Sequence, residues 1–532
     1  MSSKYQTSIG SFTRKSTFFW ASVGATVGLA NLWQFPYLAS VHGGGLFVLA
    51  YLVCLLVVTL PLMVTEAAIG RHSRHGMVLA MDGLVKTAGG SPVWRLAGPL
   101  SILASFLVLS FTAVFGGIVV AYIFFGATDS FGSANTAEAT GILAELVSSS
   151  GRYREFMGWH AFFLLLVVWV SARGVVSGVE RSLRMIVPGG LVLMFGLFGV
   201  AATQGQLASG IDSILVLRPA QFGLESLQAA FFHAFFTLGL GVGVWAIFGA
   251  YSTSHTRLKR SLLAVVLMDT LIAIVVGVMM FSVASGSGSL DGQHGFGLLF
   301  ISLPVTLAPV PFSQVVITAV FLAVMLVVWA TSIALLESVV AWFREWTGAP
   351  RSWSVIIVGT AVWLAGLGSL FSFNVWSEYR LAGATTYRWI ELVAGGVLIP
   401  LVAILVATFA GWGLTKRYSA GMLGDAPVLF RKAWLWSMRL ILPLVVAWIG
   451  IQYTAVSLAN LCENGSAAIW CSTGQSSVAE EPSVPERESD PKPENGVDEG
   501  SNVTTSTKAS VGEDANRERA APSEDDILYH SV

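Results

Sequence analysis

The chain has 532 residues, of which 54% are hydrophobic and 11% are charged, and its mean hydropathy is +0.71. Soluble domains carry about 25% charged residues, so this composition excludes an ordinary soluble protein and indicates a polytopic helical membrane protein in a lipid bilayer. The net charge is −1 and no basic domain or stripe occurs, so no nucleic-acid partner is expected.

Eleven long apolar runs predict eleven transmembrane helices. They cover about residues 18–41, 46–69, 96–125, 159–170, 185–202, 224–251, 261–285, 312–342, 355–371, 390–412 and 434–461. A further apolar stretch at 296–305, inside a region rich in Gly, Ser and Pro, is expected to form a re-entrant cap.

The two ends of the chain are polar. Residues 1–17 are expected to form a cytoplasmic N-terminus, because most of the 30 Lys and Arg residues then fall in cytoplasmic connections. Eleven spans place the C-terminus outside. Residues 462–532 form an acidic tail with almost no large apolar residues, which predicts disorder. Cys462 and Cys471, at the start of this tail, form either a disulfide or two free thiols.

The first apolar run contains an unusual stretch at residues 24–36, GATVGLANLWQFP. Asn31 and Gln34 carry amides that are costly in hydrocarbon, and Gly28 and Pro36 disfavour a regular helix. Irregular backbone at membrane depth persists only where it is buried in protein or lines a wet cavity. We therefore expect a helix that is interrupted near mid-membrane. A glycine-rich packing face is the alternative.

A second stretch at residues 235–251, FFTLGLGVGVWAIFGAY, is also apolar and broken by glycines at its centre. Two interrupted segments in corresponding halves of a chain are the best sequence indication of a transporter binding site. The GLGVG sequence follows no predicted strand, so it is not a dinucleotide-binding motif. No nucleophile–base arrangement is recognisable, and we do not expect an enzyme.

These motifs, together with TLPLMVTEAAIGR (59–71), RGVVSGVERSLRMIVP (173–188) and TSIALLE (331–337), resemble those of the neurotransmitter:sodium symporter family. The resemblance extends over about residues 12–461 and is greatest to the bacterial, eleven-helix type. It implies an all-α transporter domain at 18–461, built from two inverted five-helix repeats at about 18–205 and 224–413. Helices 1 and 6 would be broken, and an extra helix would follow at 434–461. It also implies a multi-pass location in the bacterial inner (plasma) membrane.

The resemblance implies two Na⁺ sites. The residues expected at the first are Thr26, Asn31, Thr237 and Asp269, with a substrate carboxylate as a further ligand. Asp269 is similar to the acidic residue of chloride-independent relatives, so chloride is not expected to be required; a structural, hydrogen-bonded carboxylate is the alternative. The residues expected at the second site are Gly24, Val27, Val327 and Thr331. Ala330 stands where relatives supply another side-chain oxygen.

A substrate pocket between the two breaks is also implied by the resemblance. Its expected residues are Ala25, Thr26, Leu29, Ala30, Val108, Thr112, Phe236, Thr237, Gly239, Val242 and Leu335. Gly28 replaces the Asp of amine-transporting relatives, which favours a substrate with its own carboxylate. Thr112 replaces a Tyr that binds the substrate carboxylate in relatives.

The gates differ from those of relatives. Gln34 and Glu391 occupy the positions of the outer Arg–Asp pair, and a hydrogen bond between them is expected. Phe236 is the expected lid over the substrate. At the inner face, Glu345 is expected to pair with Arg14 or Lys4; an ordinary helix-end charge is the alternative for Glu345. His233 stands where relatives often have Gln, and is either a proton-sensitive group near the site or a hydrogen-bonded helix residue.

The sequence thus predicts a sodium-coupled symporter that imports a small zwitterion, with an amino acid as the expected substrate, by alternating access. A symporter for an osmolyte or amino-acid derivative, and a non-transporting substrate sensor, are the alternatives.

Overall fold

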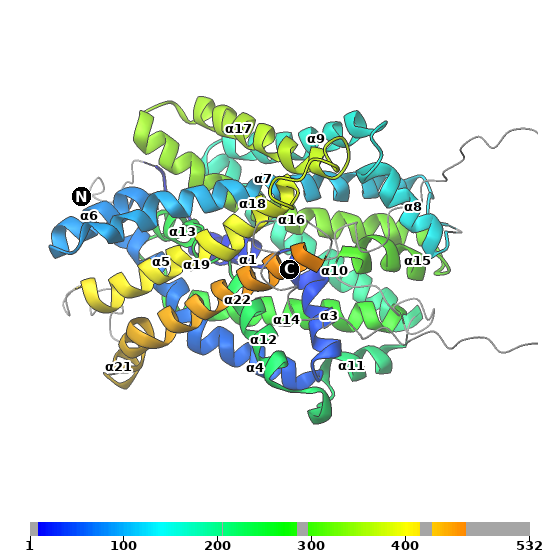
Figure 1. Cartoon of the computed structure of the whole chain (residues 1–532), viewed down its shortest axis with the longest axis horizontal. Coiled ribbons are helices and arrows are strands. Elements are labelled where there is room, and N and C mark those ends of the chain that lie inside the picture. Colours follow the sequence, from blue (N-terminus) through cyan, green and yellow to red (C-terminus); the bar gives the residue numbers. More distant parts are fainter. Residues whose placement is uncertain (1–8, 133, 205, 285–295, 415–427, 464–532) are drawn as a thin grey trace, which may run out of the picture.

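The computed structural model describes residues 9–463, apart from 133, 205, 285–295 and 415–427 (Figure 1). The predicted acidic tail, Lys4, Cys471 and the side chain of Cys462 lie outside this description.

The described chain is helical apart from its connections. Its α-helices are α1 (Lys15–Thr26), α2 (Leu29–Leu32), α3 (Gln34–Val41), α4 (Gly45–Cys54), α5 (Leu60–Ser73), α6 (Met77–Ala88), α7 (Ala97–Ala127), α8 (Thr136–Val147), α9 (Tyr153–Ala172), α10 (Arg181–Gln204), α11 (Leu207–Leu215), α12 (Leu224–Thr237), α13 (Val244–Tyr251), α14 (Leu258–Ala284), α15 (Leu303–Leu307), α16 (Ser313–Thr347), α17 (Arg351–Ser372), α18 (Thr386–Glu391), α19 (Ile399–Thr408), α21 (Val428–Trp436) and α22 (Leu442–Glu463).

Shorter helical turns join several of these. The π-helical turns are η2 (Leu55–Thr59), η4 (Val175–Glu180), η6 (Leu298–Ser302), η7 (Leu392–Leu398), η8 (Phe409–Gly413) and η9 (Ser437–Ile441), and the 3₁₀ turns are η3 (Pro92–Leu96) and η5 (Pro219–Gln221). Among the described residues, β-structure is limited to two isolated bridges, Gly44–Leu217 and Leu381–Ala384.

Nine helices in the described part of the chain are long and apolar enough to cross a membrane. They are Gly45–Ser73, Pro92–Ala127, Tyr153–Ala172, Val175–Thr203, Leu258–Ala284, Ser313–Thr347, Arg351–Ser372, Thr386–Gly413 and Trp434–Ala459. Each corresponds to a predicted span, and the all-α membrane fold is confirmed. The two remaining predicted spans are the interrupted ones, so the count of eleven crossings stays a prediction.

The first predicted span is divided into α1, α2 and α3. Helix α1 ends at Thr26, and the next two residues adopt extended backbone, with ψ of 101° at Val27 and φ of −118° at Gly28. A second irregularity at Trp33 separates α2 from α3. Carbonyl groups at the end of α1 and N–H groups at the start of α2 are thereby released from the helical hydrogen-bond pattern.

The span at 224–251 is divided into α12 and α13. Between them, Gly239, Gly241 and Gly243 have φ values of +57°, +77° and +72°. Residues with a Cβ adopt this left-handed region only with strain, which explains why the turn is built from glycines. Both predicted interruptions are therefore present in the structure.

Glycines also bring α5 and α13 into close contact. A Cβ on Gly70 would overlap the backbone of Ala246, and a Cβ on Gly249 would overlap the backbone of Ala67. Small residues allow this close approach of helix backbones within membranes. As a result, the second half of the broken helix is fixed against α5.

Three connections contain helices that the apolar pattern does not predict: α6, α8 and α11. Helix α8 begins with a capping box in which the Asn135 side chain accepts from Glu138 N and Glu138 bonds back to Asn135 N, each at 3.0 Å. The Asn-x-x-Glu spacing is a local signal from which this helix could be predicted.

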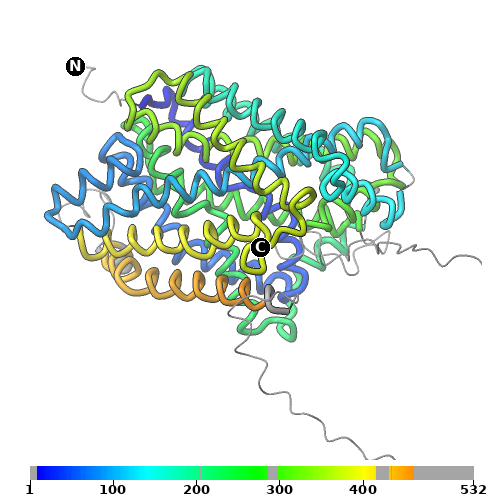
Figure 2. The backbone as a smooth tube through the Cα atoms, turned by 45° about the horizontal axis from the view of Figure 1, so that its top comes forward, coloured from blue at the N-terminus to red at the C-terminus, as the bar shows by residue number. Residues whose placement is uncertain are grey.

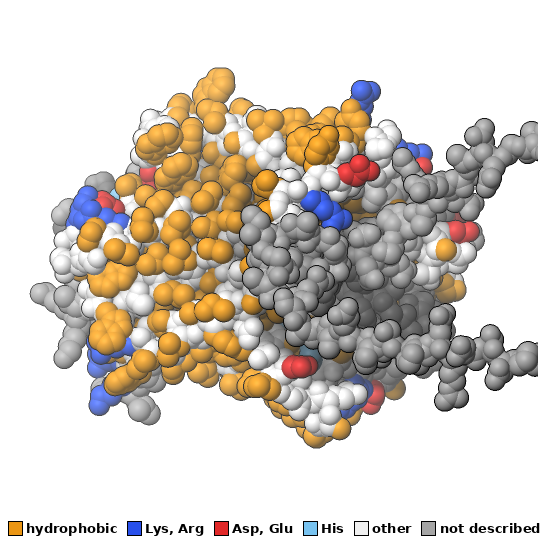
Figure 3. Space-filling view, viewed as in Figure 1, with side chains coloured by type: hydrophobic (Ala, Val, Ile, Leu, Met, Phe, Trp, Pro, Cys, Tyr) orange, Lys and Arg blue, Asp and Glu red, His pale blue; other side chains and the backbone are white. Residues whose placement is uncertain are grey.

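Most long helices run side by side along the long axis of the molecule, and α19 and α22 pack against each other in both views (Figures 1 and 2). Hydrophobic side chains cover much of the face drawn in Figure 3, while charged side chains lie toward its two ends. This distribution is typical of a protein surrounded by lipid.

Candidate ion- and substrate-binding site

Four buried polar side chains gather beside the break after α1. Asn31 Nδ2 donates to Asp269 Oδ1 at 2.8 Å, and Thr237 Oγ1 donates to Asn31 Oδ1 at 2.6 Å. Tyr51 donates its hydroxyl proton to Asp269 Oδ2 at 3.1 Å. Asn31, Tyr51 and Asp269 have no exposed surface. A carboxylate in this position is expensive unless it has partners, and Asn31 and Tyr51 supply two hydrogen-bond donors to Asp269 between α2, α4 and α14.

The residues predicted for the first Na⁺ site are therefore close together. Asn31, Thr237 and Asp269 are linked directly, and buried Thr26 ends α1 beside them, with its hydroxyl donating to Val23 O at 3.2 Å. Amide, hydroxyl and carboxylate oxygens are the ligands that hard cations prefer.

A second oxygen cluster surrounds Thr331 of α16. Its Oγ1 lies 3.1 Å from Gly24 O, 3.2 Å from Val27 O and 3.3 Å from Val327 O. One hydroxyl proton cannot serve three carbonyl acceptors at once, so these oxygens are in excess of the proton available. Such a set suits a cation, and it contains all four residues predicted for the second Na⁺ site. Ala330, buried next to Thr331, supplies no further side-chain oxygen.

A cavity of about 260 Å³ lies between the two interrupted helices. Every residue predicted for the substrate pocket lines it: Ala25, Thr26, Leu29, Ala30, Val108, Thr112, Phe236, Thr237, Gly239, Val242 and Leu335. Asn31 also lines the cavity, so the first oxygen cluster forms part of its wall. The Phe236 ring packs at a tilt against Phe232, with 4.5 Å between ring centroids, and against Tyr453, with 5.9 Å.

The outer gate residues both line this cavity, but they are paired differently from the prediction. Gln34 Oε1 lies 3.1 Å from His233 Nδ1, while Glu391 Oε2 accepts from Arg388 Nη1 at 2.8 Å. The predicted hydrogen bond between Gln34 and Glu391 is therefore wrong for this structure. Arg388 lies three residues before Glu391 in α18 and offers a charged donor that the neutral Gln34 amide does not.

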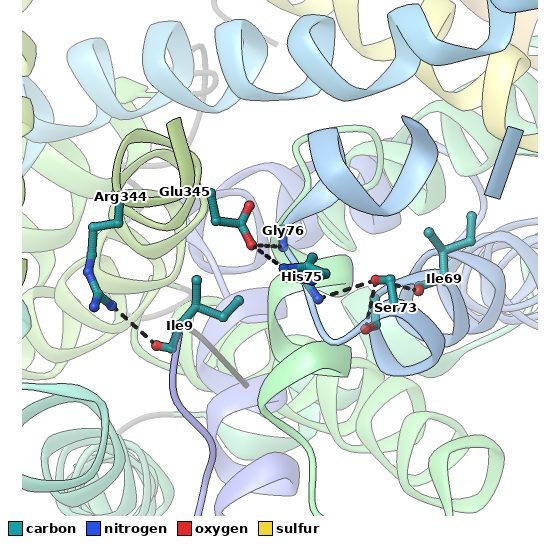
Figure 4. Close-up of polar contacts among 8 residues, drawn as sticks. Ile9, Ile69, Ser73, His75, Gly76, Arg344 and Glu345 are labelled. Carbon is teal, nitrogen blue, oxygen red and sulfur yellow. Dashed lines mark hydrogen bonds and ion pairs between the residues drawn. The ribbon is translucent and has the colours of Figure 1, made fainter. Parts of the chain in front are cut away.

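The inner gate also differs from the prediction. Glu345 Oε1 lies 3.0 Å from His75 Nδ1 and 3.0 Å from Gly76 N, so it binds the turn between α5 and α6 (Figure 4). Arg14, an expected partner, is exposed at the start of α1. The neighbouring Arg344 instead donates to the carbonyl of Ile9 at 3.4 Å. The predicted pairing of Glu345 with Arg14 is therefore wrong.

Two polar residues that the sequence analysis missed support the site. Tyr51 of α4 lies in an apolar run, where a phenol hydroxyl usually has a partner when buried; here the partner is Asp269. Glu66 of α5, fully buried, accepts from Gly241 N at 3.0 Å and so fixes the glycine turn between α12 and α13. An acidic residue inside an apolar run was the available signal for Glu66.

Similar proteins are found among transporters. Residues 10–140 match the Sodium:neurotransmitter symporter family. The chain is 28% identical over 435 residues to the uncharacterized sodium-dependent transporter YhdH of Bacillus subtilis, covering 81% of this chain and 95% of YhdH. It is 24% identical over 516 residues to the sodium- and chloride-dependent GABA transporter 2 of Macaca fascicularis, covering 84% of this chain and 80% of that one.

A solved structure also matches this fold. The crystal structure of MhsT in complex with L-phenylalanine has a TM-score of 0.74 and 28% sequence identity, covering 83% of this chain and 99% of MhsT. Together with the broken helices, this likeness defines a multi-pass helical membrane protein with the 5+5 inverted-repeat transporter fold. The chain is similar to sodium-dependent transporters, and its residues 10–140 match the sodium:neurotransmitter symporter family, whose motifs the sequence resembles.

Proposed function

We propose that this protein is a Na⁺-coupled symporter that imports a small zwitterion, most simply an amino acid, and that it is not an enzyme. The observation that carries the proposal is the cavity between the broken helices, because Asn31 and Thr237 belong both to its wall and to the Asp269 cluster. A substrate carboxylate in this cavity would add an oxygen to the first Na⁺ site. Ion and substrate would then each favour the state that binds the other, which is the thermodynamic basis of coupling.

The finer assignments belong to the same proposal. Two Na⁺ ions bind as co-substrates, one at Thr26, Asn31, Thr237 and Asp269 and one at Gly24, Val27, Val327 and Thr331. Asp269 supplies the negative charge that chloride supplies in other transporters. Gln34, Glu391 and Phe236 act at the outer gate. The MhsT complex with L-phenylalanine supports an amino-acid substrate by similarity.

The proposed topology has eleven crossings, counting the two interrupted spans, with repeats at about 18–205 and 224–413 and an extra helix at 434–461. The N-terminus is cytoplasmic and the C-terminus lies outside a bacterial inner membrane.

An osmolyte or amino-acid derivative is the alternative substrate, which the presence of Thr112 in the cavity wall favours. Thermal unfolding of the purified protein in Na⁺ or K⁺, with a panel of amino acids and osmolytes, tests the proposal. A ligand that binds the native state raises the midpoint. Stabilisation by one substrate class only in Na⁺ is the expected result. Stabilisation that is the same in K⁺ would contradict coupling, and binding without uptake into proteoliposomes would indicate a sensor.

A further inference from the structure

The chain segment that begins α1 is held against the rest of the protein at three points. Ile9 accepts from Arg344 of α16, and Phe12 N donates to Tyr251 O of α13 at 2.8 Å. The third point is Glu180, the last residue of η4. We call residues 9–17 the N-terminal arm. Ile9 and Phe12 are buried, so the arm closes over side chains of the protein interior.

Glu180 binds the arm with both carboxylate oxygens. Its Oε2 accepts from Thr13 N at 2.7 Å, and its Oε1 accepts from Thr13 Oγ1 at 2.8 Å and from Thr17 Oγ1 at 2.6 Å. Glu180 is 2% exposed and Thr17 is fully buried. The bond from Thr17 is buried and the two from exposed Thr13 are partly buried, and three short hydrogen bonds from one segment to one carboxylate make a strong contact.

The start of α1 has an electrostatic need that Glu180 meets. The N-cap residue, Arg14, makes no side-chain capping hydrogen bond, and no acidic residue occurs in the first turn. Arg14 and Lys15 place positive charge at the positive end of the helix dipole, which is unfavourable. The carboxylate of Glu180 supplies the missing negative charge from another helix. Its contact is therefore specific to the position of α1 seen here.

Building on the function proposed above, we propose that Glu180 is a positioning residue of the cytoplasmic gate, which holds α1 in its closed position. Helix α1 carries the Gly24 carbonyl of the second oxygen cluster near its far end, and Val27 follows it. For an ion in that cluster to leave toward the cytoplasm, the arm must separate from Glu180. The gate thus uses a carboxylate on the segment preceding α10, whereas Glu345 binds the α5–α6 turn (Figure 4).

The test is a distance measurement between spin labels. Labels are attached to cysteines at Ser16 in the first turn of α1 and Thr347 at the end of α16, both exposed, after the three native cysteines are replaced. Distances are measured by electron–electron double resonance in Na⁺ and in K⁺. Glu180→Gln keeps the side-chain size but replaces one acceptor oxygen with a donor group. We expect the ratio of long to short distances to rise about tenfold, because hydrogen bonds to a charged group are lost.

Thr17→Val, which removes one donor to Glu180, should shift the ratio in the same direction. The Thr17→Val/Glu180→Gln double variant should shift it by less than the sum of the two, since both changes break one contact. Glu145→Gln, at an exposed carboxylate paired with Arg152 at 2.9 Å, is the matched control and should leave the distances unchanged. If Glu180→Gln does not fold, Thr17→Val tests the same contact from its other side.

Unchanged distances in Glu180→Gln and Thr17→Val, or strictly additive effects, would overturn the proposal. The same distances in the wild-type protein test the proposed function separately from the role of Glu180. Wild-type distances that do not respond to Na⁺ would count against Na⁺-driven gating, even if the Glu180 variants shift them.

Discussion

Asp269 illustrates how the environment of a single residue defines its chemistry. Its two oxygens accept from Asn31 and Tyr51, and these partners come from segments more than 200 positions away in sequence. A buried carboxylate inside a membrane protein is costly unless it is paired, which is why Asp269 belongs to the proposed first Na⁺ site. The oxygen cluster around Thr331 differs, since it is built mainly from backbone carbonyls released at the end of α1.

Replacing Asp269 with Asn tests the first cluster. The amide keeps the size but removes the fixed charge, so the affinity for Na⁺ is expected to fall by about tenfold or more, and Na⁺-driven uptake with it. Chloride is expected to restore uptake in part by supplying the lost charge. Uptake in proteoliposomes is compared in sodium chloride and sodium gluconate. Asp212→Asn, at an exposed carboxylate paired with Arg218, is the control. Uptake that is unchanged in both salts would exclude this role of Asp269.

Thr331→Val tests the second cluster without changing side-chain volume. Loss of Oγ1 leaves the carbonyls of Gly24, Val27 and Val327 without a shared partner, and we expect Na⁺ to stabilise the protein less. The measurement is the rise in thermal midpoint with Na⁺ concentration. Thr203→Val, at an exposed threonine of α10 bonded to its own helix, is the control and should respond as the wild type does. Equal Na⁺ responses in the two variants would contradict a cation site at Thr331.

His42 gives a pH dependence at the connection between α3 and α4, where its Nδ1 lies 3.2 Å from Ser226 Oγ. Burial lowers the pKa of His42 below its ordinary value, and the Glu225 carboxylate partly opposes this. The unfolded chain then binds the proton at a higher pH than the folded chain. The stabilising contribution of neutral His42 is complete above the unfolded pKa and is lost as the pH falls through the folded pKa. Between about pH 7 and pH 5, the thermal midpoint of the wild type should therefore fall by more than that of the His42→Gln variant. An equal fall in the two proteins would contradict a contribution from His42.

Among the structural elements, the glycine turn between α12 and α13 decides the shape of the cavity. Its three left-handed glycines lead the chain past Glu66, which binds Gly241 N, and into α13. Position 241 requires glycine for two reasons. The backbone φ there is +77°, and a Cβ atom on Gly241 would lie 2.8 Å from the carbonyl oxygen of Ile399. The turn therefore cannot be replaced by an ordinary helix without moving α19.

Gly241→Ala is expected to destabilise the protein by roughly 1–2 kcal/mol from backbone strain alone, with more from the contact with Ile399. Gly196→Ala is the matched control. Gly196 lies within helix α10, and no atom would lie within 4 Å of an added Cβ, so Ala should be neutral or slightly stabilising there. Thermal midpoints of the two purified variants are compared with the wild type. Equal midpoints would show that the turn tolerates a side chain.

At the scale of the whole molecule, buried polar contacts join segments that are distant in the sequence. Glu337 of α16 accepts from Tyr251 at 2.9 Å and forms an ion pair with Arg351 of α17. Arg351 also donates to the carbonyl of Ser171 at 2.8 Å. Four helices, α9, α13, α16 and α17, are thus connected through one ion pair, whose carboxylate has no exposed surface.

Arg351→Met should be strongly destabilising, by roughly 3–5 kcal/mol, because it leaves the Glu337 charge buried without its partner. The double variant Arg351→Met/Glu337→Leu should recover part of this loss, since no unpaired charge remains. Thermal inactivation of the purified protein is the measurement. A double variant that is as unstable as the sum of the single variants would show that packing, not charge, dominates at this position.

Much of the architecture was determined by the amino-acid sequence alone. Hydrophobic runs of sufficient length predict spans because backbone groups in lipid must be satisfied within a helix, and the interrupted stretches at 24–36 and 235–251 are broken where their glycines predict. The residues of the pocket and of both oxygen clusters were also predicted, because the family motifs that identify them are local in sequence.

Pairing between distant residues was decided only by the tertiary structure. Glu345 binds His75 and Gly76, Gln34 contacts His233, and Glu180 holds Thr13 and Thr17. A charged or polar side chain has several candidate partners of suitable chemistry, and the sequence alone does not rank their distances. The packing of the helices decides which partner lies close enough, because a hydrogen bond requires its donor and acceptor atoms to lie about 3 Å apart.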